Sequence, residues 1–485
     1  MKKLLYILTV VVVVATACSK NISDLNVDTK QPATSPSYAF FTNAQRVLTN
    51  TLTSSNVNLN IFRLIVQHWQ ETQYPEESQY DLGTREINDA IWDAFYRDVI
   101  RDLREAKTLI PTDVLTTSGA PDAGRQKNEL AIAEIMEVYA WYYLVTTYGN
   151  IPYSEAFDLA DPFPVYDDAK TIYTDLLSRL DVAIGQLDPA EGSFDGADVI
   201  YAGDPAQWMK FGNSLKLRMG ITIADDDDNA ARTAIESAVA GGVFESNDDN
   251  AVFNYLGAPP NTNPLWVDLV QSGRDDFVAA STLIDELLDK NDPRIDNFFT
   301  EDQTGRGSAV TSYSGATPGV QSAYVQYSQV EPSITDPAFP GLLMDYAEVE
   351  FYLAEAAQRG YNVGGTAATH YAAAVTASIE YWGGTPAEAT AYLAQPSVAY
   401  NPVNWKESIG IQQWIAHYNR GYDAWNSWRR LDYPQLEEAT DALSGIPVRF
   451  PYPVNEQLVN RINFEAAADA IGGDEVETKL WFDKF

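Results

Sequence analysis

Most of the chain places apolar and polar residues in the pattern of amphipathic helices. The strongest signal lies in residues 128–157. Four apolar side chains recur there at helical spacing, namely Ile132, Ile135, Tyr139 and Tyr142. The opposite face of the second half is also apolar, so we expect a helix that is buried on two sides. Gly149 and Pro152 follow, and both residue types are typical of a helix end.

Further segments share this periodicity. The other predicted helices span residues 38–52, 57–70, 86–110, 165–187, 204–224, 230–240, 341–359, 366–381, 405–420 and 421–433. Helix pairs recur about every 35–45 residues, a spacing typical of tetratricopeptide-type arrays, in which one pair cannot bury its apolar face alone. The pairs are 128–157 with 165–187, 204–224 with 230–240, and 341–359 with 366–381. The strict repeat signature is absent, so the pattern predicts a mainly all-α scaffold of tetratricopeptide-like pairs.

Residues 246–340 differ from the rest of the chain in composition and in hydrophobic periodicity. Helical periodicity falls there, apart from residues 279–289, while Gly, Pro, Asn, Ser and Thr become frequent. Aromatic residues occur singly. We expect an irregular, loop-rich layer resting on a helical scaffold of residues 38–245 and 341–445. Loops held by a rigid scaffold commonly carry binding sites, so we look for a ligand here.

The N-terminus carries an export signal. Lys2 and Lys3 precede an apolar run at residues 4–17, which is too short to span a bilayer as a stable helix. Cys18, the only cysteine of the chain, follows Ala15-Thr16-Ala17 and resembles a bacterial lipobox. The resemblance implies a signal peptide of residues 1–17 and a lipid on Cys18. The alternative is a plain secretory signal with an incidental cysteine. Residues 18–37 then form a tether and extended arm, and residues 38–485 a single domain.

Charge narrows the possible partners. The chain has 68 acidic and 32 basic residues, a formal charge of −36. Such a surface repels phosphate backbones, so we exclude nucleic acid as a partner. It also repels anionic lipid, so membrane attachment would depend on acyl chains.

No catalytic motif is present. The chain lacks G-x-S-x-G, H-E-x-x-H and a phosphate-binding loop. The three histidines, His68, His370 and His417, are unclustered, and we expect structural roles for them. Pairs of carboxylates carry no information in so acidic a chain, because a glycosidase requires a fixed separation that the sequence does not show. We therefore expect no enzyme.

Several conspicuous residues have structural interpretations. The acidic run at residues 225–228 is interpreted as a solvated turn that caps the helix from residue 230, the alternative being a Ca²⁺ loop, although its spacing does not match an EF-hand. We expect no cofactor. Asp292 and Arg294 are predicted to form a structural ion pair. Four tryptophans in predicted helices are assigned to the core, namely Trp208, Trp414, Trp425 and Trp428.

The ligand candidates are aromatic and amide residues in polar, non-periodic surroundings. Aromatic faces stack on sugar rings or peptide side chains, while amides fix orientation. The candidates are Trp69, Gln70, Gln73, Tyr74, Tyr80, Trp266, Tyr313, Tyr324 and Tyr327.

Segments spread along the whole chain resemble one family. They are Cys18 followed by Asp24-Leu25-Asn26, LVTTYGNIPYSEAF (144–157), DPAQWMKFGNSLKLRMGI (204–221), KNDPRIDNFF (290–299), LMDYAEVEFYLAEAAQRG (343–360) and GYDAWNSWRRLDYP (421–434). Together they resemble the SusD/RagB family of nutrient-binding outer-membrane lipoproteins of Bacteroidetes-type bacteria. The chain is nearer the branch without a known shared glycan ligand than to the starch-binding prototype.

This resemblance implies tetratricopeptide-like pairs on one side and an irregular ligand-binding face on the other. It implies a lipid-anchored protein at the cell surface, acting as the lid of a TonB-dependent outer-membrane transporter. The protein would capture an oligosaccharide or oligopeptide and catalyse no reaction. Contact residues vary within the family and are not carried over. The alternatives are a secreted glycan- or peptide-degrading hydrolase and a helical scaffold without a small ligand.

Overall fold

The computed structural model describes residues 35–113, 121–158, 160–302 and 313–485. Residues 37–485 form one compact, mainly helical unit, which confirms the predicted fold class. The predicted signal peptide, Cys18 and the tether up to residue 34 lie outside the described residues. Among the helices of the described ranges, none is long and apolar enough to cross a membrane.

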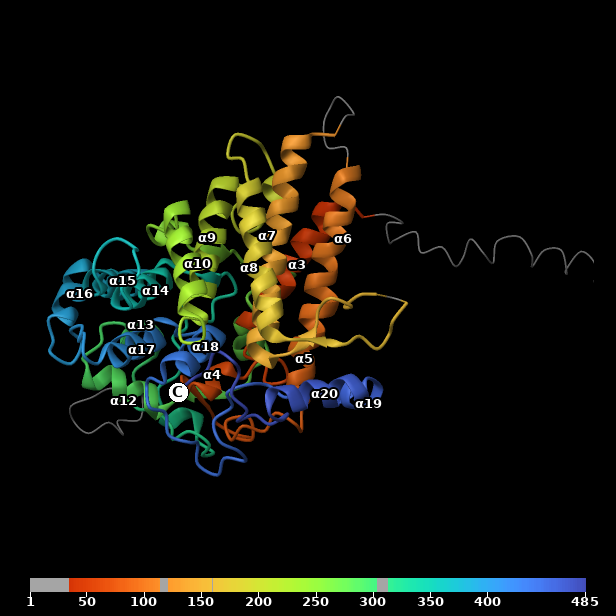
Figure 1. Cartoon of the computed structure of the whole chain (residues 1–485). Coiled ribbons are helices and arrows are strands. Elements are labelled where there is room, and N and C mark those ends of the chain that lie inside the picture. Colours follow the sequence, from red (N-terminus) through yellow and green to blue (C-terminus); the bar gives the residue numbers. More distant parts are fainter. Residues whose placement is uncertain (1–34, 114–120, 159, 303–312) are drawn as a thin grey trace, which may run out of the picture. The chain divides into compact units, whose positions relative to one another are not determined.

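The first part of the scaffold is a layer of helices. Figure 1 shows α6, α7, α8, α9 and α10 side by side, and successive helices of this layer pack against each other. The bounds are α3 (Ser37–Thr53), α5 (Ile87–Asp93), α6 (Arg101–Leu109), α7 (Ala123–Tyr148), α8 (Ala169–Gln186), α9 (Pro205–Thr222) and α10 (Asp228–Gly241). A π-helix at Ala94–Ile100 joins α5 to α6, so the predicted helix at residues 86–110 is interrupted.

The second part of the scaffold follows the loop-rich layer in sequence. Its helices are α14 (Tyr346–Gln358), α15 (Ala367–Tyr381), α16 (Pro386–Leu393), α17 (Trp405–Ala416) and α18 (Gly421–Leu431). Helix α14 packs against α15 and α17, and also against α9, which connects the two parts. The predicted pairs are confirmed as α7 with α8, α9 with α10, and α14 with α15.

Helix α7 lies at the centre of this array. The Asp122 side chain caps its first turn by accepting a hydrogen bond from the Arg125 amide at 3.1 Å. Tyr139 and Trp141, which point in different directions, are both fully buried, as the two-sided apolar pattern predicts. Gly149 ends the helix with φ +89°, and a Cβ there would lie 2.9 Å from the Leu480 side chain. The positive φ therefore favours glycine at this position, and a larger residue would also displace the Leu480 side chain.

Two predicted helices are partly wrong. Residues 57–70 form only the short α4 (Phe62–Ile65), because Gln67 adopts a left-handed conformation and the chain then enters strand β1 (Trp69–Glu71). The segment at 341–359 begins with strand β6 (Gly341–Met344), and α14 starts only after Asp345 caps it. Sequence analysis also missed α16, α19 (Val454–Val459) and α20 (Arg461–Ile471).

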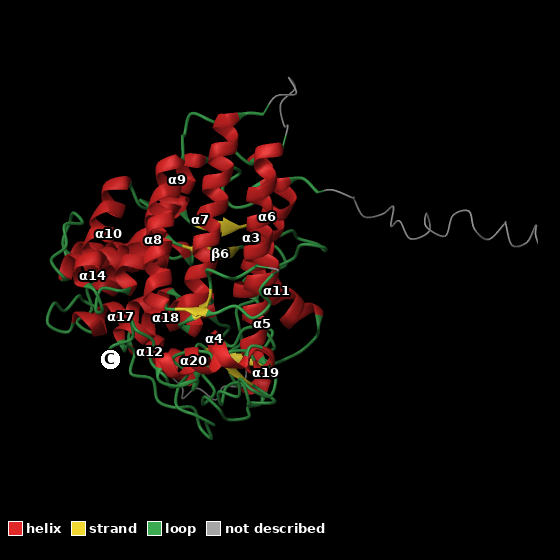
Figure 2. Cartoon of the chain, turned by 45° about the vertical axis from the view of Figure 1, so that its right-hand side comes forward, coloured by secondary structure: helices red, strands yellow, loops and turns green. Residues whose placement is uncertain are grey.

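The loop-rich layer contains short helices and small sheets, in agreement with its composition. The strands of the described residues form three two-stranded antiparallel sheets, which Figure 2 shows as short yellow arrows. Strand β1 pairs with β5 (Phe277–Ala279), β4 (Ala251–Phe253) with β6, and β2 (Ile151–Pro152) with β3 (Tyr166–Asp167). The helical elements are α11 (Pro264–Trp266), which continues as a π-helix at Val267–Gln271, then α12 (Ser281–Asp289) and α13 (Ile295–Phe298). The β1–β5 and β4–β6 pairs attach this layer to the scaffold.

The residues with structural interpretations are buried or ion-paired. Arg294 pairs with Asp292 at 2.5 Å, and both side chains are buried, as predicted. The four core tryptophans are buried, as are His68 and His417, while His370 contacts Glu350 at 2.7 Å. The acidic run serves as a turn that caps α10. Its partners are Arg359 for Asp225, Lys170 and Lys484 for Asp226, the Ala230 amide for Asp227, and the Tyr361 hydroxyl for Asp228.

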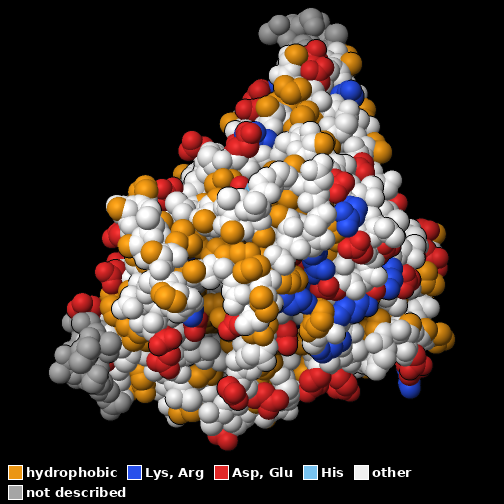
Figure 3. Space-filling view, turned by 60° about the vertical axis from the view of Figure 1, so that its left-hand side comes forward, with side chains coloured by type: hydrophobic (Ala, Val, Ile, Leu, Met, Phe, Trp, Pro, Cys, Tyr) orange, Lys and Arg blue, Asp and Glu red, His pale blue; other side chains and the backbone are white. Residues whose placement is uncertain are grey.

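The surface reflects the acidic composition. Figure 3 shows acidic side chains scattered over one face, with Lys and Arg side chains gathered in one region of it. Arg104, Lys107 and Arg179 surround the buried Glu137 of α7. Burial raises the pKa of Glu137, but the three cations outweigh it and lower the pKa to about 2.

Candidate functional site

Two adjoining pockets lie where the loop-rich layer meets residues 55–85. The first, which we call the Tyr74 pocket, has a volume of about 310 Å³, and the second, the Tyr324 pocket, about 240 Å³. They share Arg274, Asp276 and Phe277 as a common wall. The remaining lining of the Tyr74 pocket includes Asn58, Glu71, Gln73, Tyr74, Arg85 and Asp268. That of the Tyr324 pocket includes Leu269, Val270, Thr300, Tyr324, Gln329 and Thr335.

Strand pairing builds the common wall. In the β1–β5 register Glu71 lies opposite Phe277, so two segments that are far apart in sequence meet at the pockets. Beyond the strands, the Thr72 amide donates to the Asp276 carbonyl at 2.8 Å and its hydroxyl to the Asp275 carbonyl at 2.5 Å. The position of the wall therefore depends on main-chain contacts, which fix the backbone more firmly than flexible side chains would.

Tyr74 presents its ring to solvent at the mouth of the first pocket. Its side chain is 62% exposed, and its backbone adopts φ +67°, a conformation uncommon for a residue other than glycine. Backbone strain of this kind clusters at ligand-binding sites. Phe277 is buried in the common wall, so the two pockets combine an exposed aromatic face with apolar and polar neighbours. Such a lining suits a sugar ring, whose apolar face stacks while its hydroxyls hydrogen-bond.

Charged groups in the pockets are matched in pairs. Arg274 contacts Asp276 at 2.5 Å, and Arg85 contacts Glu77 immediately behind the wall. Asp268 accepts hydrogen bonds from the Ser54 hydroxyl and the Ser55 amide, both at 3.1 Å, and burial raises its pKa. Burial, reinforced by Glu77, raises the pKa of Glu71 to about 9. Both effects favour the protonated, uncharged form of Glu71.

The structure brings three of the predicted ligand residues to these pockets. Gln73 and Tyr74 line the first, and Tyr324 lines the second. Trp266, Tyr313 and Tyr327 are partly exposed but do not line either pocket. The Tyr313 hydroxyl instead donates to Asp296 at 2.5 Å. Ligand contact by these six side chains stays a prediction.

Three other candidates are corrected by their burial. Trp69 is 1% exposed, donates its indole N–H to the Tyr418 hydroxyl at 3.1 Å, and packs against Phe277 from behind the wall. Gln70 is buried and accepts from the Gly319 amide at 2.8 Å. Tyr80 is 3% exposed. None of these three side chains lines the Tyr74 or Tyr324 pocket.

Sequence analysis missed most of the charged lining. Glu71, Arg85, Asp268, Arg274 and Asp276 come from three separate segments, and no local spacing indicates that they meet. The one available signal was Phe277, a single aromatic residue in the polar segment after Gly273. Its pairing with β1 depends on the fold, which sequence periodicity does not supply.

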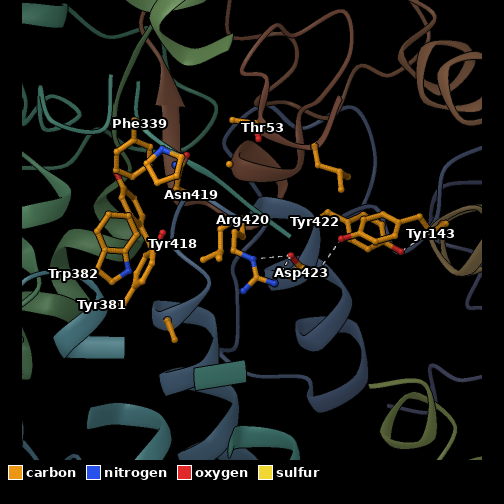
Figure 4. Close-up of a pocket in the computed structure, with 15 residues that line it drawn as sticks. Thr53, Tyr143, Phe339, Tyr381, Trp382, Tyr418, Asn419, Arg420, Tyr422 and Asp423 are labelled. Atoms are coloured by element: carbon orange, nitrogen blue, oxygen red, sulfur yellow. Dashed lines mark hydrogen bonds and ion pairs between the residues drawn. The ribbon is translucent and has the colours of Figure 1, made fainter. Parts of the chain in front are cut away.

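A third, much smaller cavity lies inside the scaffold. Figure 4 shows it between Tyr143, Tyr418, Tyr422 and Trp382, with Arg420 and Asp423 at its floor. Its volume is about 30 Å³, the space of about one water molecule. Arg420 contacts Glu348 and Asp423 at 2.5 and 2.8 Å, and Arg218 contacts Glu348 at 2.5 Å. This cavity is too small for an oligomer and belongs to a structural ion cluster.

The residues suited to metal binding are dispersed. Within residues 35–113, 121–158, 160–302 and 313–485, no three His, Cys, Asp or Glu side chains are placed to hold a metal ion. Each carboxylate of the acidic run already has its own partner, which is a basic side chain, a main-chain amide or a tyrosine hydroxyl. The expectation of no cofactor, with Ca²⁺ as its alternative, stays a prediction.

Comparison with known proteins places the chain in a family. A family model described as "Starch-binding associating with outer membrane" (SusD-like_2) matches residues 28–453. A solved structure described as a chitin-binding protein is similar, with TM-score 0.80 and 29% identity over 93% of this chain and 100% of that one. A SusD homolog from Bacteroides uniformis has TM-score 0.78 and 26% identity, covering 92% of this chain and all of its own.

A further structure, described as a chitin-binding SusD homolog from Flavobacterium johnsoniae, has TM-score 0.77 and 24% identity over 92% of this chain and 98% of that one. At this identity the likeness shows the fold alone. None of the curated proteins compared with the chain matches it. The matched family is one of binding proteins, so binding and not catalysis is the activity to explain. The chain belongs to the SusD-like family, whose model is described as starch-binding and associating with the outer membrane.

Proposed function

We propose that this protein is a cell-surface lipoprotein that captures an oligosaccharide in the Tyr74 and Tyr324 pockets. The observation that carries the proposal is the pair of adjoining pockets, lined by Tyr74 and by Tyr324, in a SusD-like chain. The volume of the first pocket falls within the range of about 300–1,000 Å³ that is common for small-ligand sites. The second pocket extends the site, as an oligomer requires.

A neutral, chitin-type oligosaccharide is the ligand we propose first. The solved structure with 29% identity is described as a chitin-binding protein. Exposed Tyr74 and half-buried Tyr324 offer one aromatic face to each pocket. We propose that a sugar ring stacks on each face, with Gln73 and Gln329 as hydrogen-bonding amides.

The test is calorimetric titration of the folded chain with chitooligosaccharides. We expect Tyr74→Ala and Tyr324→Ala each to weaken binding about tenfold, since one stacked ring contributes about 1–1.5 kcal/mol. Tyr38→Ala is the matched control, because Tyr38 is 41% exposed on α3 and lies outside both pockets. Equal affinity in all three variants, or binding of oligopeptides alone, would contradict the proposal.

The proposal extends to a transporter and a lipid anchor. The family model describes association with the outer membrane, which supports attachment through Cys18 and a role as the lid of a TonB-dependent transporter. The charge of −36 supports an acyl anchor over adhesion to anionic lipid. We expect Cys18→Ala to abolish partitioning into detergent and the transporter to co-purify with the wild type. Unchanged partitioning of the variant would refute the anchor.

A further inference from the structure

Two serines hold the carboxylate of Asp268 in the wall of the Tyr74 pocket. Its Oδ2 accepts hydrogen bonds from the Ser54 hydroxyl and the Ser55 amide, both at 3.1 Å, and from the Ser55 hydroxyl at 3.3 Å. Both serines are only 4% exposed, so they form a firm support. Within the described residues no N–H or O–H group donates to the second oxygen, Oδ1. One oxygen is therefore anchored, and the other is left for a ligand.

The local fold fixes the position of Asp268. The Asn263 side chain caps α11 by accepting from the Leu265 amide at 2.7 Å, and α11 then widens into the π-helix Val267–Gln271, which carries Asp268. π-Helical turns are rare, and they occur frequently at functional sites. The Asp268 carbonyl accepts from the Ser272 hydroxyl at 2.5 Å at the end of this turn. Both the main chain and the carboxylate of Asp268 are therefore held in place.

The two guanidinium groups that line the pocket already have acidic partners. Arg274 contacts Asp276 at 2.5 Å, and Arg85 contacts Glu77. The hydrogen-bond donors of Asp268 are serine groups, and neither arginine is among them. The matched pairs largely cancel their own charges, so the negative charge of Asp268 is the one that a ligand meets in this pocket.

One buried cation, Arg63, acts on Asp268 from inside the protein. It attracts the carboxylate, but its own N–H groups donate to the Thr53, Ser54 and Asn419 carbonyls, each at 2.8 Å. Arg63 is 3% exposed and does not line the pocket. Its charge therefore favours the ionised form of Asp268 without itself reaching a ligand.

Other features of the lining also suit a cationic group. Tyr74 is 62% exposed, and the face of an aromatic ring attracts an ammonium group. Glu71 brings a further carboxyl group to the same pocket. The formal charge of −36 draws cations towards the chain as a whole. The pocket thus combines an anchored carboxylate, an aromatic face and an acidic surrounding.

We propose that the Tyr74 pocket recognises a free amino group on a sugar, and that Asp268 is the specificity-determining residue that receives it. This preference rests on the proposed function, because it selects among chitin-type oligomers. Glucosamine, the unit left when chitin loses an acetyl group, carries an amine that is an ammonium group with three N–H donors when protonated. Its hydrogen bond to an anchored carboxylate is charge-assisted and stronger than that of the uncharged acetamido N–H.

Calorimetric titration of the folded chain with N-acetylated and fully deacetylated chitooligosaccharides of equal length tests the preference. At about pH 6 amines are cationic, and we expect the wild type to bind the deacetylated oligomer at least about tenfold more tightly. This preference should shrink as the salt concentration rises, because salt screens charges that are open to solvent. Asp268→Asn should bring the two affinities within about threefold of each other, since its amide can still accept from Ser54 and Ser55 but carries no charge.

Two further variants complete the test. Asp248→Asn is the matched control, because Asp248 is exposed in the loop-rich layer outside both pockets and its loss changes the net charge equally. This variant should keep the preference of the wild type. Arg274→Met removes a side chain that is 59% exposed, so the fold should tolerate it, and it leaves Asp276 as a second unmatched carboxylate in the pocket. We expect it to bind the deacetylated oligomer about threefold more tightly than the wild type.

The outcomes separate this inference from the proposed function. Equal binding of both oligomers by the wild type, or tighter binding of the N-acetylated one, would overturn the recognition of an amino group and leave glycan capture intact. A preference that persists in Asp268→Asn would belong to the acidic surface as a whole and would overturn the role of Asp268. Binding of neither oligomer would overturn both proposals.

Discussion

Two regions of this molecule use the same residue types to different ends. The scaffold contains Arg218, Arg420, Glu348 and Asp423 in one cluster, and the Tyr74 pocket contains Arg274, Arg85 and three carboxyl groups. In the scaffold cluster Glu348 is 0% exposed and lies between two arginines. In the pocket Arg274 is 59% exposed. Burial therefore separates a cluster that specifies the fold from one that is available to a ligand.

The buried cluster also connects distant parts of the chain. Arg218 comes from α9, Glu348 from α14, and Arg420 immediately precedes α18. Burial raises the pKa of Glu348, but Arg218 and Arg420 outweigh it, and the net direction is downward. Asp423 shows the opposite balance, because burial raises its pKa more than the arginines lower it. The charged residues of this cluster therefore hold α9, α14 and α18 together.

The largest effect should follow from breaking this cluster. Glu348→Gln leaves Arg218 and Arg420 buried without their shared carboxylate, and we expect a loss of about 3–5 kcal/mol in the free energy of unfolding. Urea denaturation followed by tryptophan fluorescence measures it. Arg97→Met is the control, since Arg97 pairs with Asp98 on the surface and should change stability by less than about 1 kcal/mol. Similar losses in both variants would show that burial does not decide how much an ion pair contributes to stability.

A second prediction concerns Glu137, where a buried carboxylate meets partly exposed cations. Its folded pKa of about 2 lies below its unfolded value, so its stabilisation is present above about pH 4.5 and is lost as pH falls towards about 2. We expect a loss of about 2–3 kcal/mol over this range. Urea titrations of the wild type and Glu137→Gln measure it, and the variant should lack most of this acid dependence. Parallel pH profiles would contradict the assignment.

The two regions also differed in what could be predicted from sequence. The scaffold was predictable because helical periodicity is local: Asp204 caps α9 and Gly149 ends α7 as their sequences indicate. The pockets were not, because Glu71 reaches Phe277 only through the β1–β5 pairing. Trp69 illustrates the error. Its polar neighbours made it a ligand candidate, yet the tertiary fold turns it inward against Tyr418.

A third prediction tests the wall of the Tyr74 pocket through stability. Glu71 has a folded pKa of about 9, above its unfolded value, so its contribution is fully present below about pH 4.5 and is lost as pH rises towards about 9. We expect the wild type to lose stability in this window, and Glu71→Gln to lose less. Urea unfolding across this window measures the difference. Glu76→Gln should follow the wild type, and an equal slope in Glu71→Gln would argue against a protonated Glu71.

The smallest effect on stability is expected where we propose that the ligand binds. Arg274→Met removes an exposed partner of Asp276 and should change the free energy of unfolding by less than about 0.5–1 kcal/mol, because solvent screens such a pair. The same change leaves Asp276 as an unmatched negative charge on the wall shared by both pockets. Affinity for an anionic oligosaccharide should therefore fall further while thermal stability stays almost constant. Calorimetric titration and thermal unfolding of the same sample separate the two quantities. A large loss of stability without a change in binding would place Arg274 with the scaffold cluster, and the distinction between the two regions would fail at this residue.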